Sequence, residues 1–255
     1  MFTTLHRTIV ITALLLASTL RGQQNAAPPF VYDQIDTHYF YNADGTGRRT
    51  QEIRAAILTP AGVQAFGQLV FGYNSETERL AIDYVRVRKP DGQIVTTAVE
   101  SAKEASLEIS KSAPVYSDHL QRHISVAGLS PGDTIEYKTT TTFVSALAPN
   151  QFWLSHSFEK RSRVKSEVLV IDVPKNRTIK LKTASSHGSE DAGDRRILRW
   201  SNTNETAEAG GRKTGEDPVP DVQLSTFQSW QEVASWYDAL LRDRTPYNAT
   251  ANSLC

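Results

Sequence analysis

The feature that most limits the fold of this chain is an alternation of polar and apolar residues with a period of two. The clearest example spans residues 134–144 (TIEYKTTTTFV). One face carries Ile135, Tyr137, Thr139, Thr141 and Phe143, and the other carries Glu136, Lys138, Thr140 and Thr142. A run rich in threonine and aromatic residues that alternates in this way is typical of a strand with one buried face. We therefore expect a core built mainly from β-sheet.

Similar patterns recur along most of the chain. Strands are predicted at 31–41, 48–58, 80–87, 93–98, 122–126, 152–158, 168–173, 179–182 and 195–201. The apolar phase changes near Tyr84, which predicts either a bulge or a strand buried on both sides. Residues 168–173 are apolar on both parities, as in a strand near the middle of a sheet or covered on both faces. Turn sequences at 89–92 (KPDG) and 130–133 (SPGD) separate strands. This density of strands favours an antiparallel β-sandwich over residues 28–221.

A different period begins after a polar, Gly- and Pro-rich stretch at 202–221, which is interpreted as a linker or a long surface loop. Apolar side chains then recur at helical spacing, at Trp230, Val233, Ala234, Tyr237, Leu240 and Leu241. Ser229 and Glu232 form a capping box at the start of this predicted amphipathic helix. Because few residues follow it, we expect 225–255 to be the opening of a truncated further domain. The alternative is that the helix packs back on the sandwich.

The N-terminal segment 1–24 has the layout of a secretory signal peptide, with Arg7 ahead of an uncharged apolar run at 9–20. That run is shorter than the roughly 20 residues that cross a bilayer. The alternative is an uncleaved membrane anchor. The signal predicts an extracytoplasmic protein that is periplasmic, on the cell surface or secreted.

Charge and cysteine content exclude several functional classes. Lys plus Arg and Asp plus Glu both total 28, whereas a nucleic-acid-binding protein usually carries a basic excess. The sequence has one cysteine, Cys255, so a disulfide framework within the chain and cysteine-based zinc sites are excluded.

Two short motifs contain residue types that could carry chemistry. His119 and His123 have the spacing of two metal ligands on a helix, but Leu120 stands where a zinc protease motif needs Glu. They also lead into a predicted strand, where they would lie about 13 Å apart, so they are interpreted as surface histidines. Ser162 and Lys165 match S-x-x-K without its usual companion motifs.

Three further clusters have structural interpretations. Glu190, Asp191 and Asp194 suit calcium by composition, but their Ser and Gly neighbours favour a hairpin loop. The segment 44–47 (DGTG) is interpreted as a hairpin turn. Trp153 and Trp200 could form a sugar-binding platform, although aromatic residues in strands usually pack in the core. The sequence therefore predicts no catalytic, cofactor-binding or metal-binding residue and no cofactor.

Several of these stretches, in this order, resemble a bacterial family, the domain of unknown function 3857. The matching features are the Tyr73 segment, 85–92 (VRVRKPDG), 116–118 (YSD), 128–137 (GLSPGDTIEY), Trp200 and the predicted C-terminal helix. The resemblance implies an immunoglobulin-like sandwich that precedes transglutaminase-like domains in exported proteins. Those domains carry a Cys-His-Asp constellation, but the surroundings of Cys255, after Ser253 and Leu254, do not match it, so no catalysis is carried over to Cys255.

We therefore expect an exported, non-catalytic accessory or interaction domain, and not an enzyme in its own right. Its expected partner is a following transglutaminase-like domain or another extracytoplasmic protein, with no nucleic acid. Membrane contact is expected only through the signal segment, if that segment is uncleaved. Two alternatives stay open: a fragment of a transglutaminase-like or cysteine-protease-like enzyme that uses Cys255, and a carbohydrate- or surface-binding sandwich.

Overall fold

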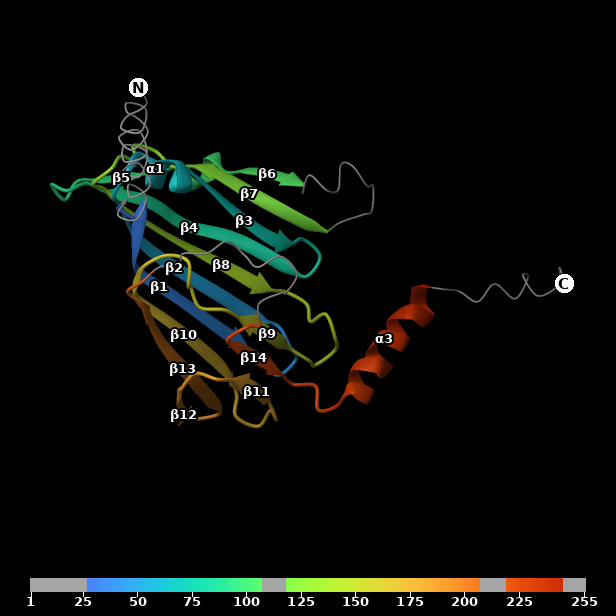
Figure 1. The fold of residues 1–255 in the computed structure, drawn as a ribbon. Helices are drawn as coiled ribbons and strands as arrows, with labels where there is room; N and C mark the ends of the chain where they lie inside the picture. The colour runs from blue at the N-terminus through green and yellow to red at the C-terminus, as the bar shows by residue number, and fades with distance from the viewer. Residues whose placement is uncertain (1–26, 107–117, 207–218, 245–255) are drawn as a thin grey trace, which may run out of the picture.

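The computed structural model describes residues 27–106, 118–206 and 219–244. Its largest element is an eight-stranded sheet with the order β12-β13-β10-β1-β2-β8-β4-β5 (Figure 1). The strands are β1 (Phe30–Tyr41), β2 (Gly47–Ile57), β4 (Glu78–Arg88), β5 (Ile94–Thr96), β8 (Thr134–Phe143), β10 (Val164–Pro174), β12 (Gly188–Ala192) and β13 (Arg195–Asn204). Neighbours are antiparallel except β1 and β10, which run parallel.

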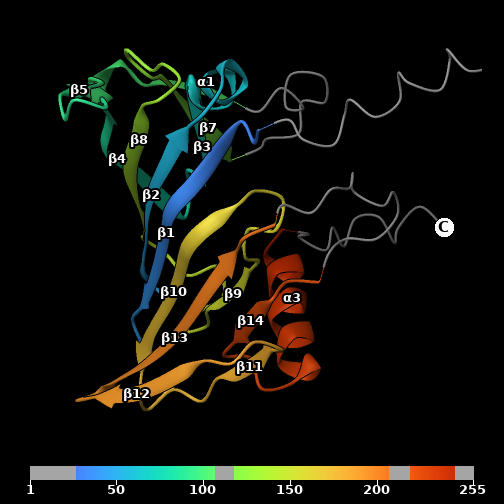
Figure 2. The ribbon, with the colours of Figure 1, turned by 60° about the vertical axis from the view of Figure 1, so that its left-hand side comes forward.

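Two three-stranded sheets form the second layer, both on the same face of the large sheet (Figure 2). One has the order β3-β7-β6 and contains β3 (Gln68–Asn74), β6 (Lys103–Ser106) and β7 (His119–Ser125). The other has the order β11-β14-β9 and contains β9 (Trp153–His156), β11 (Lys180–Thr183) and β14 (Val222–Ser225). The helical elements are α1 (Pro60–Phe66), the 3-10 turn η1 (Val99–Ser101) and α3 (Trp230–Arg244).

Each small sheet encloses its own hydrophobic core against the long strands. The first core lies under β3, β7 and α1 and includes Ile35, Val85 and Ile135. The second lies under β9 and β14 and includes Leu169 and Trp200. Strand β1 contributes to both cores, because Ile35 belongs to the first and Tyr39 and Tyr41 to the second.

Threonines occupy the buried face of the long strands between these two cores. Thr37 and Thr141 are 3% and 1% exposed. Their hydroxyl oxygens accept hydrogen bonds from Gln51 (3.4 Å) and Arg49 (3.3 Å), respectively. Because buried hydroxyls need partners, this polar seam divides the apolar interior while the sheet itself stays continuous.

The mainly β, sandwich-like fold with a C-terminal helix is confirmed, although its second layer is divided into two sheets. The predicted bulge appears as a register shift between Ile82 and Tyr84. Strand β10 lies between β13 and β1, in agreement with its apolar character on both parities. Residues 60–74 and 99–106, where no strand was predicted, hold α1, β3, η1 and β6.

Strand β14 was not predicted, and it lies past residue 221, where the sandwich was expected to end. It is the central strand of the β11-β14-β9 sheet, and its Val222 and Leu224 are 0% and 2% exposed. The sandwich therefore includes residues that follow the predicted linker. Among the described residues, no helix is both long and apolar enough to span a bilayer. The predicted signal peptide at 1–24 lies outside those residues.

Candidate functional site

Helix α3 lies beside the outer face of the β11-β14-β9 sheet (Figure 2). Its main contact is Trp236, whose ring centroid is 5.7 Å from that of Trp153 and 5.9 Å from that of Phe227. A groove of about 570 Å3 lies between the sheet and the first part of the helix, from Trp230 to Trp236. Leu181 of β11 and Val233 of α3 also line this groove.

The start of α3 is fixed by the predicted capping box. The Ser229 hydroxyl accepts a hydrogen bond from the Glu232 backbone N–H at 3.1 Å. The Glu232 carboxylate accepts one from the Gln228 N–H at 2.8 Å, one residue earlier than the usual reciprocal bond. The Gln228 side chain in turn donates to the Thr178 carbonyl at 3.1 Å. These bonds orient the helix away from the end of β14.

Most of the predicted apolar stripe of α3 is exposed. Trp230 and Tyr237 are 83% and 59% exposed, and Leu240 is 37% exposed. The helix thus packs back on the sandwich only in part, through Val233 and through Trp236, which the predicted stripe left out. We call the combined exposed face and groove the aromatic surface; it consists of Trp153, Phe227, Trp230, Trp236, Tyr237 and Leu240.

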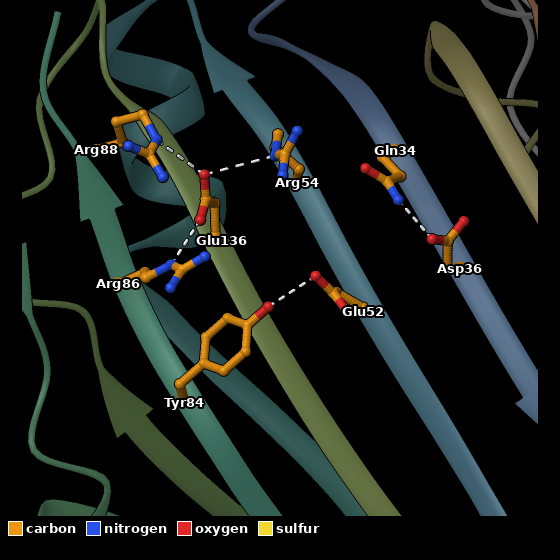
Figure 3. A network of polar contacts seen from close by, with 8 residues as sticks. All are labelled: Gln34, Asp36, Glu52, Arg54, Tyr84, Arg86, Arg88 and Glu136. Atoms are coloured by element: carbon orange, nitrogen blue, oxygen red, sulfur yellow. Dashed lines mark hydrogen bonds and ion pairs between the residues drawn. The ribbon is translucent and has the colours of Figure 1, made fainter. Parts of the chain in front are cut away.

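A second candidate site lies on the outer face of the large sheet, opposite the two small sheets. Glu136 of β8 is 3% exposed, and the guanidinium groups of three arginines surround it (Figure 3). The Nε atoms of Arg86, Arg88 and Arg54 lie 2.6, 3.1 and 3.5 Å from its carboxylate oxygens. We call these four residues the arginine cluster.

The arginines determine the charge state of Glu136. Burial by itself would raise the pKa of this carboxyl group, but the hydrogen bonds from Arg88 and Arg86 and their positive charges outweigh it, so the pKa is lowered. Glu136 is therefore ionised at neutral pH. The sequence placed it correctly on the polar face of its strand, but gave no sign that long neighbouring side chains bury it.

Tyr84 and Glu52 lie beside the arginine cluster and extend its polar contacts along the sheet (Figure 3). The Tyr84 hydroxyl donates to Glu52 at 2.8 Å, and burial together with that bond raises the pKa of Tyr84 to about 12. The Arg86 guanidinium stacks over the Tyr84 ring at 4.6 Å. Arg86 thus connects Tyr84 and Glu52 to the arginine cluster.

Residues of the histidine and S-x-x-K motifs make contacts that stabilise the fold. His119 and His123 lie in β7, as the strand prediction required, and His123 pairs with Gln121 at 3.3 Å. Lys165 binds Asp33 at 2.6 Å, so its ammonium group is occupied away from Ser162. The described residues contain no group of three or more potential metal ligands.

The acidic cluster lies in the β12–β13 hairpin, and the two residues of the tryptophan pair are separated by the fold. Asp191 lies 3.1 Å from Lys175 and 3.2 Å from Arg196, and hydrogen bonds from both lower its pKa. Trp200 is 1% exposed while Trp153 is 38% exposed, so these two residues do not share a platform. Cys255 lies outside the described residues.

Two of the motifs that carry the family resemblance, the turns at 89–92 and 130–133, are joined by an ion pair, which we call the latch. Lys89, from the KPDG turn, donates to the Asp133 carboxylate at 2.7 Å. Asp133 is 3% exposed and also accepts the Ser130 N–H at 2.7 Å. Gly92 and Gly132 provide positive φ angles of 89° and 92°, which glycine adopts without steric cost. Lys89, Gly92, Gly132 and Asp133 therefore have a structural role, which is to form the two turns and hold them together.

A family model for a domain of unknown function with solved structure, DUF3857, matches residues 43–208. The chain belongs to this family. The match covers β2 to β13 and so includes the latch and the arginine cluster, but it ends before β14 and α3.

Among solved structures, this DUF3857 protein is similar to a candidate protease from Parabacteroides distasonis, with a TM-score of 0.70 and 18% sequence identity. The alignment covers 86% of this chain and 48% of that protein, so the likeness shows the fold, over less than half of the other protein. An M1 zinc metallopeptidase from Deinococcus radiodurans gives a TM-score of 0.40 at 8% identity, over 77% of this chain and 42% of its own. No curated protein gives a significant match.

Proposed function

We propose that this chain is an exported, non-catalytic interaction module whose aromatic surface packs against a transglutaminase-like catalytic domain. The observation that carries the proposal is the exposure of Trp230 and Tyr237 on a helix that is otherwise anchored to the sandwich. Clustered large apolar residues on a surface mark interaction sites. Tryptophan and tyrosine are also the residue types that contribute most to binding energy at interfaces.

The anchoring of α3 supports this role. Between its cap and Trp236, the helix presents Trp230 in a defined orientation, which lowers the entropic cost of binding through that side chain. Lys180 and Lys182 border the groove beside the aromatic side chains. The aromatic surface thus has an apolar centre and a cationic rim, the usual arrangement of protein interfaces.

The nature of the partner follows from the family resemblance described above. The similar Parabacteroides distasonis protein is described as a candidate protease, and this chain spans 48% of its length, which leaves room for a second domain there. The non-catalytic role is consistent with the pairing of the candidate reactive groups, such as Lys165 with Asp33. Export would be checked by the N-terminal mass of the protein recovered from its host.

The experiment is hydrogen exchange of α3 in two preparations. One is this chain produced alone. The other is the protein isolated from its host together with any further domain or bound protein. In the chain alone, we expect the amides after Trp236 to exchange quickly, because the exposed side chains do not hold the helix. In the host preparation, they should be protected.

A matched pair of variants links that protection to the aromatic surface. Tyr237→Ser should weaken binding of the transglutaminase-like domain by about tenfold, as expected for an interface aromatic residue. Val70→Ser, at a 46% exposed position on β3, should leave binding unchanged. If α3 is fully protected in the chain alone, or if both variants behave alike, the proposal is wrong.

Glycan binding is a second candidate, favoured by one observation: Trp153, Trp230 and Trp236 line the same groove beside polar Gln223. Aromatic rings with adjacent polar groups suit sugar rings. Binding on a glycan array that is lost in Trp153→Ala and kept in Tyr237→Ser would favour this candidate over domain packing.

A further inference from the structure

We propose that the arginine cluster is a binding site for a phosphate or sulfate group, separate from the aromatic surface. The cluster joins three adjacent strands of the large sheet, since Arg54 is on β2, Glu136 on β8, and Arg86 and Arg88 on β4 (Figure 3). Glu136 pairs in register with Arg54 on one side and with Arg86 on the other. The sheet therefore fixes the positions from which all three arginines project.

The hydrogen bonds inside the cluster leave much of each guanidinium group available. Arg86 and Arg88 both bind the carboxylate through Nε, and Nε is also the closest atom of Arg54. Among the described residues, the terminal amino groups of these arginines donate no hydrogen bond to another group. A guanidinium offers five N–H donors in a planar fork that fits oxyanions. Glu136 thus positions three guanidinium groups and occupies only part of their N–H donors.

The charge of the cluster selects the class of ligand. One buried carboxylate needs one cation for neutrality, yet three surround Glu136, which leaves a formal excess of two positive charges. A phosphate monoester carries about −1.5 to −2 charges near pH 7. A dianion would therefore neutralise the excess, whereas a single carboxylate would not.

The site is also open to ligand. The side chains of Arg54, Arg86 and Arg88 are 45%, 35% and 43% exposed. Figure 2 shows no other described element layered on this face of the large sheet. The bonds to Glu136 already hold the arginine side chains in place. An incoming oxyanion therefore meets preorganised donors, and less side-chain entropy is lost on binding.

The test is a titration with inorganic phosphate at constant ionic strength, followed by the Nε–Hε signals of the arginines in NMR spectra. Sulfate serves as a second dianion and acetate as a monoanion. We expect saturable shifts of the cluster signals with phosphate and sulfate, and weak or no saturation with acetate. Such a pattern distinguishes a dianion site from general charge attraction.

Variants assign the binding to the cluster. Arg86→Gln should weaken phosphate binding by about tenfold or more, as expected for the loss of a charge-assisted hydrogen bond. Arg54→Gln should weaken it as well, and this variant keeps both hydrogen bonds to Glu136, so it tests the site without disturbing its centre. The control is Arg79→Gln, on β4 and the same sheet face, where Arg79 donates to the Glu78 carbonyl.

Saturable binding that is weakened in Arg86→Gln and Arg54→Gln and unchanged in Arg79→Gln would support the site. Absence of saturation, or equal weakening in all three variants, means an adventitious ion only and overturns the proposal. Because the aromatic surface takes no part in the titration, either result is independent of the proposed function.

Discussion

Replacement of Glu136 by Gln tests the energetic role that the structure gives to its carboxylate. The change keeps the size of the side chain and removes the charge at the centre of the arginine cluster. Two charge-assisted hydrogen bonds are converted to neutral ones, those from Arg86 at 2.6 Å and from Arg88 at 3.1 Å. Three arginines then also face one another without a compensating anion.

The expected loss is about 2 kcal/mol at neutral pH. Hydrogen bonds to charged groups contribute about 1.5–3 kcal/mol each and neutral ones about 1 kcal/mol. The arginine side chains are 35% and 43% exposed, which favours the lower end of that range because solvent screens the charges. The 3.5 Å pair with Arg54 adds little for the same reason. For a domain of this size, the melting temperature should fall by about 4–8 °C.

The pH dependence gives the sharper test. The pKa of Glu136 is lowered in the folded state, whereas an unfolded glutamate titrates near pKa 4.3. Its contribution is therefore complete above about pH 5 and is lost as pH falls through the lowered folded pKa. The difference between wild type and Glu136→Gln should shrink towards zero at the acid end of this window.

The measurement is urea unfolding followed by tryptophan fluorescence at several pH values, with the buried Trp200 as a reporter. Glu205→Gln is the control, because Glu205 is 75% exposed and lies 3.8 Å from Arg163, so its loss should cost less than about 1 kcal/mol. Equal stability of Glu136→Gln and wild type at neutral pH would refute the reasoning. So would a difference that persists undiminished in acid.

Three other substitutions, one of them with a matched control, test the packing and one turn. Trp236→Ala should speed hydrogen exchange in α3 and leave the urea midpoint of the sandwich nearly unchanged, whereas Trp230→Ala, at an 83% exposed position, should do neither; similar exchange in both variants would contradict the anchoring role. Leu224→Ala should cost about 2–5 kcal/mol in urea unfolding, and a loss under about 1 kcal/mol would be inconsistent with its burial. Gly45→Ala should cost about 1–3 kcal/mol, because φ is +88° and a Cβ atom would lie 2.4 Å from the Gln151 carbonyl oxygen; an unchanged midpoint would count against this.

Alternation in the sequence was enough to place most strands and the bulge before Tyr84, since burial of one sheet face is recorded locally in a period of two. It did not reveal the parallel pairing of β1 with β10, because 132 positions separate the paired residues Tyr32 and Val164. Strand β14 was missed for a related reason. Its four residues directly follow the stretch that was interpreted as a linker, and its partners β9 and β11 lie much earlier in the sequence.

The candidate sites were harder to predict than the fold. Arg86, Arg88 and Glu136 occupy polar faces of their strands, which the alternation indicates, but their meeting depends on the register of β4 against β8. Trp236 was left out of the apolar stripe because the stripe was chosen by spacing alone. Its contact with Trp153 is tertiary, and no local pattern reports it.

The short connection between β14 and α3 has a mechanical consequence. Residues 226–229 alone separate α3 from β14, whose Val222 and Leu224 belong to the second core. A force applied to α3 would therefore enter the molecule at the central strand of the β11-β14-β9 sheet. The first core is linked to that sheet only through the long strands. Tension on α3 would therefore act on the second core first and would reach the first core only through those strands.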